Sequence, residues 1–304
     1  EEYVDYGVKK VADMTAEQIK EALLAAGLWP ALTQRPYGII ANPEVKPKAI
    51  FVSAFSTAPL AANVEYALNG QLDNIQAAVD ALGKIAKVHV CVNAANESAT
   101  LFGKLQNVTL HTVSGKHPAG NVGVQIHHIS PIQKGETVWT VSLVMLAAIG
   151  KLFNTGKYDV RRKVAVTGPK AEGAAYVETY PGVAMKDLKD FYASAENLRF
   201  VSGDALTGTN VGAEGFLGFF DNQVTILEEG NKYELLGWAK PVRCSQFSAS
   251  RTYFSWLTPN KKYDMDTNLH GGPRAFVMND LYSKVLPMDL YPVYLLKACL
   301  ANDI

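Results

Sequence analysis

Apolar positions follow two different periods along the first half of the chain. An apolar stripe at helical spacing predicts a helix over Leu72–Ala86, and a second apolar stretch predicts one over Leu143–Thr155. Short, continuous apolar runs predict buried strands at Ala49–Ala54, Lys87–Val92, Val108–Val113 and Thr137–Ser142. Strands that alternate with helices in this way favour an α/β fold with a doubly wound, Rossmann-like parallel sheet.

The segment before the first strand has clear helix start and stop signals. Thr15 and Gln18 have the spacing of a capping box, and Gly27 suits the left-handed residue that ends a helix. Residues 1–13 are interpreted as a linker or the tail of a missing N-terminal domain. Leu28–Pro47 contains four prolines and is predicted to be irregular.

After Asp159 the pattern changes to strands around a single short helix. Strands are predicted at Lys163–Thr167, Ala174–Thr179, Arg199–Val201 and Val224–Leu227, with the helix at Ala184–Ala193. This content is typical of a β-grasp (ubiquitin-like) domain. A strand-like Phe247–Trp256 and an apolar, helical Leu281–Leu300 follow. The predicted domains are 1–13, 14–160 (Rossmann-like), 161–240 (β-grasp) and 241–304 (returning strands and a C-terminal helical segment).

Charge and cysteine content exclude several classes of protein. The 304 residues carry 29 basic and 29 acidic side chains, so no overall field attracts nucleic acid. The cysteines Cys91, Cys244 and Cys299 lie far apart, and neither they nor the histidines have metal-ligand spacing. The longest uncharged apolar stretch, Thr137–Ile149, is shorter than the ~20 residues that span a bilayer. We therefore expect no metal site, no disulfide framework, no signal peptide and no transmembrane segment.

The stretch Ser114–His128, SGKHPAGNVGVQIHH, is the most distinctive part of the chain. It follows a predicted strand and contains Gly115, Gly120 and Gly123. A glycine turn between a strand and a helix can present backbone N–H groups to a polar ligand. The same glycines can simply permit a tight turn, because glycine tolerates positive φ. The pattern is neither GxGxxG nor a P-loop, and both interpretations stay open.

Five motifs in order along the chain carry a resemblance to a known family. They are SGKHPAGNVGVQIHHISP (114–131), AGLWPALTQRPYG (26–38), AIGKLFNTG (148–156), LHGGPRAFV (269–277) and VLPMDLYP (285–292). Together they resemble the NqrA subunit of the Na⁺-translocating NADH:quinone oxidoreductase, the Nqr complex. The resemblance implies a peripheral subunit on the cytoplasmic face of the inner membrane. Its complex belongs to the respiratory chain, passes electrons from NADH to ubiquinone and transports sodium ions.

The same resemblance extends to flavin-binding subunits of complex I and of Rnf complexes, whose cofactor motifs are altered here. Their glycine-rich flavin loop corresponds to Gly27–Pro36, where Trp29, Pro30 and Leu32 add bulk or remove N–H donors. Ser56 stands where their acidic residue lies. Their iron–sulfur cysteines correspond to Phe276, Asn279, Tyr282 and Leu286. The comparison implies a chain with no redox cofactor of its own.

No catalytic constellation stands out among the remaining residues. Ser114 and His117 are close in sequence but lack a nucleophile elbow, and Asp264 and Asp266 are typical of a solvated turn. A quinone needs an apolar slot with one or two hydrogen-bond donors. The side chains that could supply these, as quinone contacts or alternatively as core or partner interface, are Trp29, Arg35, Tyr37, Phe55 and His117. In a doubly wound sheet, Phe55 and His117 lie beyond the carboxyl ends of strands, where ligands bind.

Three functions follow as hypotheses. The first is a cofactor-free docking scaffold of the Nqr complex that also contacts ubiquinone, with the membrane subunits as partners. The second is a flavin-dependent NADH dehydrogenase subunit resembling that of complex I. The third is a metabolite-binding α/β protein without a respiratory role.

Overall fold

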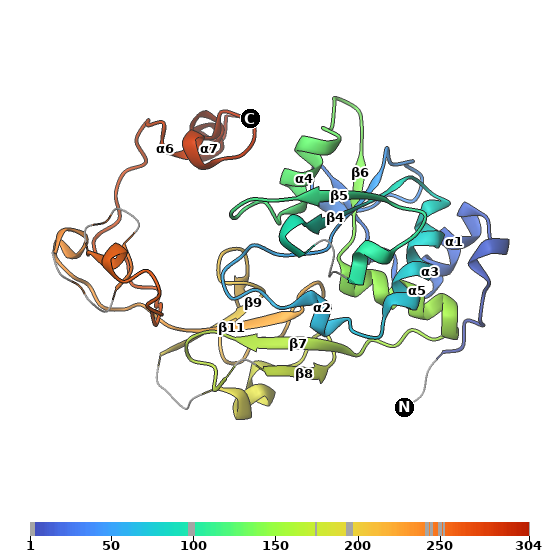
Figure 1. The fold of residues 1–304 in the computed structure, drawn as a ribbon, viewed down its shortest axis with the longest axis horizontal. Helices are drawn as coiled ribbons and strands as arrows, with labels where there is room; N and C mark the ends of the chain where they lie inside the picture. Colours follow the sequence, from blue (N-terminus) through green and yellow to red (C-terminus); the bar gives the residue numbers. More distant parts are fainter. Residues whose placement is uncertain are drawn as a thin grey trace.

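The computed structural model describes residues 4–96, 101–173, 175–192, 197–240, 243, 246–248, 251 and 253–303. The described chain is a mixed α/β protein with two β-sheets, followed by an arm that extends from them (Figure 1). The first sheet and its helices come from residues up to about 155, and the second sheet from residues 162–228.

The first sheet has six strands in the order β2-β1-β6-β3-β4-β5. The bounds are β1 Thr33–Arg35, β2 Ile39–Ile40, β3 Ile50–Ser53, β4 Val88–Asn93, β5 Thr109–Val113 and β6 Val138–Thr140. The pairs β3/β4, β4/β5 and β3/β6 are parallel. The pairs β1/β6 and β1/β2 are antiparallel and extend the sheet at one edge.

Both faces of this sheet are covered by helices because the strands alternate two sets of apolar side chains. Ile50 and Val52 of β3 belong to a core shared with α1 (Ala16–Ala25), α3 (Leu72–Gly83) and α5 (Leu143–Thr155). Phe51, between them, belongs to a smaller core with Ile126 of α4 (Val122–Ile129). This alternation is the period-2 geometry of a strand buried on both sides.

The predicted helix ends are confirmed by their hydrogen bonds. Thr15 accepts from the Gln18 N–H, and the Gln18 side chain accepts from the Thr15 N–H, so the capping box is complete. Gly27 follows the end of α1 with φ of +71°. The Ser142 hydroxyl caps α5, whose C-cap Gly156 lies in the left-handed region. The structure gives α5 the predicted bounds and ends α3 three residues earlier than predicted.

The second sheet has five strands in the order β10-β9-β11-β7-β8. Its elements are β7 Arg162–Thr167, β8 Ala175–Thr179, a 3-10 helix Met185–Phe191, β9 Leu198–Ser202, β10 Thr209–Asn210 and β11 Gln223–Glu228. The β11/β7 pair is parallel and the other pairs are antiparallel. Met185 and Leu188 of the short helix pack onto Val164 and Ile226 and complete this second core.

Three predicted segments differ in the structure. The segment 28–47 is not irregular, since Leu28, Trp29 and Leu32 fill the core and β1 joins the sheet. The segment 247–256 forms no strand among its described residues; it leads into a 3-10 turn, Ser255–Leu257. The helical end 281–300 is divided into α6 (Leu281–Val285) and α7 (Pro292–Ala301), because Pro287 interrupts the helical pattern.

The first residues of the described chain lie against the first sheet's helices. The Tyr6 N–H donates to the Gly156 carbonyl at 2.8 Å, and Lys84 Nζ donates to the Ala12 carbonyl at 2.9 Å. The domain boundaries predicted from the sequence stay predictions.

Helices α3 and α5 approach closely at Gly150, where a Cβ would lie 1.6 Å from the Asn74 carbonyl oxygen. We expect Gly150→Ala to lower the free energy of unfolding by about 3 kcal/mol, since the two backbones would have to separate. Chemical denaturation measures this change. Gly83→Ala is the matched control within α3, because a Cβ there meets nothing within 4 Å. It should raise stability by about 0.5 kcal/mol; equal destabilisation by both substitutions would contradict the close approach.

Candidate functional site

Two loops at the carboxyl ends of parallel strands form the centre of the candidate site. One follows β3 and the other follows β5, and Thr57 connects them. Its Oγ1 accepts from the Gly120 N–H at 3.0 Å and lies 3.1 Å from His117 Nδ1. A Cβ on Gly120 would lie 2.7 Å from the Thr57 backbone nitrogen, so only glycine permits this packing.

Ser53 and Gln125 hold the inner side of the same contact. The Gln125 amide is 2 % exposed, and its Nε2 donates to Ser53 Oγ at 2.9 Å and to the Ala119 carbonyl at 3.1 Å. The Ser53 hydroxyl in turn lies 2.9 Å from the Gly120 carbonyl oxygen. The loop therefore has a fixed conformation, supported by side chains from β3 and α4.

A groove of about 640 Å³ runs along this loop and α4. Its apolar wall includes Val113, Pro118, Val124, Ile129, Val285 and Pro287, and its polar groups include His111, Lys116 and His117. Residues Val285 and Pro287 come from the C-terminal arm. His128 Nε2 lies 2.6 Å from the Pro287 carbonyl oxygen, and the Asp289 N–H donates to His127 Nε2 at 3.4 Å. The adjacent histidines thus hold the arm along the groove.

A stacked pair of histidines lies beside the groove, on the face of the sheet that α4 covers. His89 Nδ1 lies 2.8 Å from His111 Nε2, and the His89 ring also stacks on Phe51 with centroids 4.6 Å apart. Burial, the neighbouring His111 and Lys87 lower the pKa of His89 from 6.5 to about 4. Burial and Lys87 also lower the pKa of His111. At neutral pH this pair is uncharged and can exchange a proton only within its own hydrogen bond.

The loop after β3 is also fastened to the second sheet. The Gln223 side chain of β11 is 4 % exposed; its Oε1 accepts from the Ala62 N–H at 2.7 Å and its Nε2 donates to the Leu60 carbonyl at 3.0 Å. The Tyr176 hydroxyl of β8 accepts from the Asn63 N–H at 2.6 Å. These bonds connect the two sheets through the loop that carries Thr57.

The structure does not bring the five predicted quinone-contacting residues to one place. Trp29 is buried, its indole N–H donates to the Ala41 carbonyl at 2.6 Å, and its ring meets Trp139 edge to face. Arg35 is on β1, with a buried Nε that has no hydrogen-bond partner among the described residues, and Tyr37 is 81 % exposed nearby. Only Phe55 and His117 lie at the loops beyond the carboxyl ends.

The three predicted loop glycines have different environments. Gly120 is the residue that the Thr57 contact requires, and Gly115 adopts φ of +150° with a Cβ position 3.1 Å from Ala119. Gly123 lies in the first turn of α4, and a Cβ there would meet nothing within 4 Å. Sequence reasoning missed Thr57, Gln125 and the His89–His111 pair, because each depends on contacts between residues distant in the chain.

Other candidates considered from the sequence have ordinary contacts. Asp264 pairs with Lys170 at 3.4 Å, and Asp266 accepts from the Asn268 side chain at 2.7 Å. Burial raises the pKa of the Cys91 thiol to about 12, which keeps it unreactive, and Cys244 lies outside the described residues. Within the described ranges, no three His, Cys, Asp or Glu side chains are grouped so as to hold a metal ion. No described helix has the length and hydrophobicity needed to cross a bilayer.

Comparison with known proteins identifies the family. Residues 14–158 match the family model described as the NqrA second alpha/beta domain. Over 99 % of this chain and 67 % of the relative, 38 % of residues are identical to the NqrA subunit of the Na(+)-translocating NADH-quinone reductase from Serratia proteamaculans. The chain belongs to the NqrA family. The resemblance predicted from the five motifs is confirmed.

Other members of the NqrA family match over almost the whole chain. The Pseudomonas aeruginosa PAO1 protein is 35 % identical over 99 % of this chain, and the Rhodopirellula baltica protein is 36 % identical over 94 %. The chain spans about two thirds of the length of these relatives: 67 % and 63 %. A solved NAD⁺-reducing [NiFe]-hydrogenase chain has 14 % identity and a TM-score of 0.48, covering 72 % of this chain and 47 % of its own; a likeness this distant implies nothing about function.

The buried histidine makes the stability of this NqrA chain depend on pH. An unfolded His89 takes up a proton below about pH 6.5, whereas the folded one does so only near pH 4. Stability should therefore fall as the pH drops from 6.5 towards 4, by on the order of 2 kcal/mol. Denaturant unfolding at several pH values measures this. His89→Gln, which retains a hydrogen-bonding group, should flatten the profile between pH 6.5 and 4.5; an unchanged slope would contradict the assignment.

The contact between the two loops predicts a local effect at Thr57. Thr57→Val removes the acceptor of the Gly120 N–H, and we expect amide hydrogen exchange in residues 114–121 to become about tenfold faster. Ser56→Ala is the matched control, since Ser56 Oγ only accepts from the Ala58 N–H on the exposed side of the same loop. Equal exchange in both variants would show that the Thr57 contact does not order the loop.

Proposed function

We propose that the chain acts as a peripheral, cytoplasmic subunit of the sodium-translocating NADH:ubiquinone reductase, without a redox cofactor of its own. In this role it is a docking scaffold for the membrane subunits and contacts ubiquinone. The observation that carries the proposal is the 38 % identity, over 99 % of this chain, to an NqrA subunit of that reductase.

The strand order supports a Rossmann-like first domain and a β-grasp second domain. The parallel strands β5-β4-β3-β6 lie in the order 3-2-1-4 when numbered along the chain. The connections through α3 and α4 lie on opposite faces, as in doubly wound folds. In the second sheet, the short helix Met185–Phe191 packs against a mixed sheet whose parallel pair is β7/β11.

A flavin phosphate does not fit the segment Gly27–Pro36, where related flavin-binding chains hold theirs. The N–H groups of Gly27, Leu28 and Ala31 donate to the carbonyls of Leu24, Leu23 and Leu28. Leu28 and Leu32 are fully buried and occupy the space that a cofactor would need. A phosphate cradle requires free N–H groups around a concavity, and this segment supplies neither.

The positions that correspond to iron–sulfur ligands also do not fit a cluster. Phe276 and Tyr282 meet edge to face with centroids 5.5 Å apart, and the Lys297 ammonium lies over the Phe276 ring. Asn279 caps the start of α6 by accepting from the Leu281 N–H. These side chains make structural contacts and provide no thiolate.

The groove beside α4 supports the proposed quinone contact better than the Trp29 region does. It combines an apolar wall with His117, whose ring lies between the groove and Thr57. A quinone ring could lie on Pro118 and Val124 while an imidazole N–H donates to a quinone carbonyl. Trp29 has no access to a ligand unless the core opens, so we place the contact at His117.

Assembly and colour test the scaffold role. The purified chain should lack stoichiometric flavin or iron–sulfur absorbance and should co-purify with the membrane subunits of the reductase when these are co-expressed. NADH-dependent dye reduction by this chain alone, with added FMN, would support the flavoenzyme hypothesis instead. Absence of co-purification in the intact complex would reject the scaffold.

Quinone contact has its own measurement. We expect a short-chain ubiquinone, titrated by calorimetry, to bind the chain, and His117→Ala to weaken binding about tenfold through loss of one hydrogen bond. His127→Ala is the control, because His127 contacts the arm and does not line the groove. Unchanged affinity in His117→Ala would remove this residue from the quinone site and leave the scaffold role intact.

A further inference from the structure

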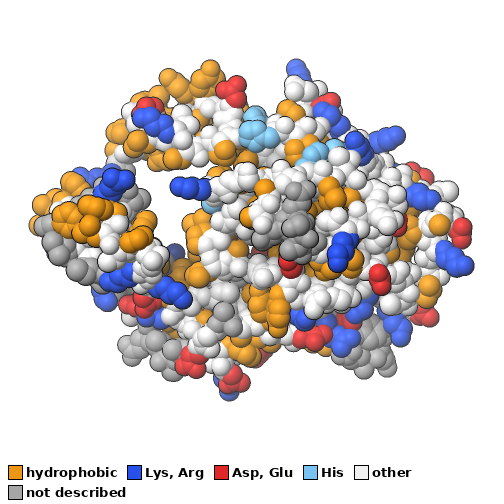
Figure 2. Space-filling model, viewed as in Figure 1, with side chains coloured by type: hydrophobic (Ala, Val, Ile, Leu, Met, Phe, Trp, Pro, Cys, Tyr) orange, Lys and Arg blue, Asp and Glu red, His pale blue; other side chains and the backbone are white. Residues whose placement is uncertain are grey.

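The C-terminal arm, residues 231–303, exposes most of its apolar surface. Among its described apolar side chains only Tyr253 and Val293 are buried, whereas the two sheets bury extensive cores. Figure 2 shows apolar side chains gathered over the arm, beside Lys and Arg side chains. A segment without its own core is stabilised when another surface covers it.

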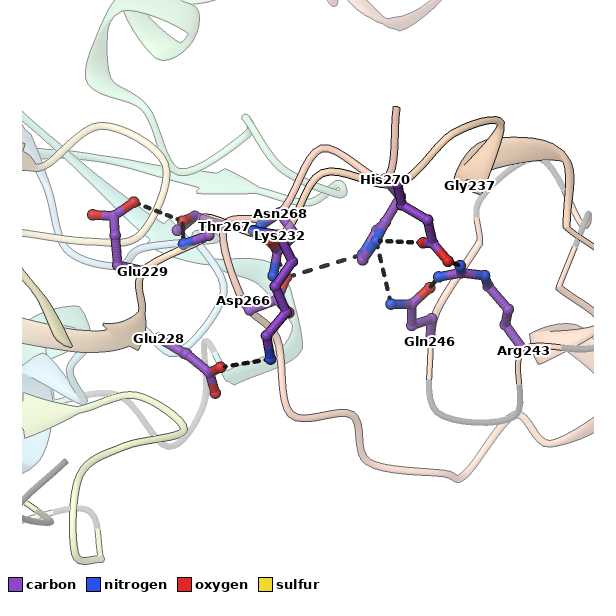
Figure 3. Close-up of polar contacts among 12 residues, drawn as sticks. Glu228, Glu229, Lys232, Gly237, Arg243, Gln246, Asp266, Thr267, Asn268 and His270 are labelled. Atoms are coloured by element: carbon purple, nitrogen blue, oxygen red, sulfur yellow. Dashed lines mark hydrogen bonds and ion pairs between the residues drawn. The ribbon is translucent and has the colours of Figure 1, made fainter. Parts of the chain in front are cut away.

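The base of the arm is held by polar contacts with the second sheet. The Gly230 N–H donates to Thr267 Oγ1 at 2.6 Å, Lys232 pairs with Glu228, and His270 lies between Glu234 and Asp266 (Figure 3). Glu234 also pairs with Lys240 and Arg243. The acidic groups near the arm are thus engaged at its base and not at its end.

The end of the arm, residues 251–262, combines exposed aromatic and apolar side chains with positive charge. Phe254, Trp256 and Leu257 are 44 %, 52 % and 63 % exposed. Consecutive turns, with hydrogen bonds Phe254 to Arg251, Leu257 to Phe254 and Lys261 to Thr258, keep them compactly together. From residue 235 to residue 263 the sequence has five basic residues and no acidic one, although the whole chain is neutral.

We infer that residues 251–262 dock on the surface of an anionic lipid bilayer. Trp256, Phe254 and Leu257 enter the headgroup region, where aromatic side chains of this kind are enriched. Arg251, Lys261 and Lys262 then lie at the level of the lipid phosphates. A charge of one sign beside shallow apolar side chains matches a surface of the opposite sign, so the bilayer is favoured over a protein groove. This contact goes beyond the scaffold role and does not depend on it.

Vesicle flotation of the full chain tests the lipid contact. The chain should float with vesicles of phosphatidylcholine and phosphatidylglycerol at low salt, and should not float with phosphatidylcholine alone or at high salt. Lys261→Ala/Lys262→Ala should weaken binding about thirtyfold. In a Trp238→Phe background, Trp256 emission should shift to shorter wavelength on binding.

Matched variants separate the lipid contact from general stickiness. Lys9→Ala/Lys10→Ala removes two adjacent exposed lysines outside the arm, and Phe220→Ser removes an exposed aromatic ring from the body; both should bind vesicles like the unmodified chain. Trp256→Ser/Leu257→Ser should abolish flotation while circular dichroism stays unchanged. Absence of flotation with anionic vesicles, or flotation that the arm variants leave unchanged, would overturn the inference. Loss of binding to the detergent-solubilised reductase without any lipid binding would assign the surface to a protein partner instead.

Discussion

The close approach of α3 and α5 at Gly150 determines how the first half of the chain is arranged. With no side chain at Gly150, the α5 backbone reaches the Asn74 carbonyl, and both helices lie flat on one face of the parallel sheet. Ile75, Leu82 and Leu146 are then fully buried against β3 and β4. This packing fixes the strand order and therefore the loops that follow β3 and β5.

The loops at the carboxyl ends depend on that frame but are ordered by polar contacts. Thr57, Gln125 and Ser53 satisfy one another and the Gly120 backbone within a small, buried volume. A buried polar network of this kind specifies a single loop conformation, because each unmade bond would cost free energy. The groove beside α4 therefore has a preformed wall, to which the arm contributes Val285 and Pro287.

The two halves of the described chain differ in what covers their apolar side chains. The sheets satisfy themselves, and Gln223 connects them through backbone atoms of the loop at Leu60 and Ala62. The arm instead presents aromatic and aliphatic side chains outward. A member of a membrane-bound reductase has both kinds of surface available to it, neighbouring chains and lipid, and the proposals above assign different parts of the chain to each.

The sequence by itself determined the elements whose signals are local. The period of the apolar residues predicted α3, α5 and the strands β3, β4, β5 and β7–β9 and β11 within a few residues, and Thr15 with Gln18 predicted the helix start. These signals depend only on neighbours along the chain. The five ordered motifs also identified the family that the relatives confirm.

Tertiary structure alone decided which side chains meet. Trp29 and His117 were equal candidates in the sequence, but burial against Trp139 places one in the core and contact with Thr57 places the other at a groove. The strand β1 was hidden among prolines because it gains its hydrogen bonds from β6, about a hundred residues later. The pKa of His89 likewise follows from its burial beside His111 on the next strand, a neighbour that no local pattern reveals.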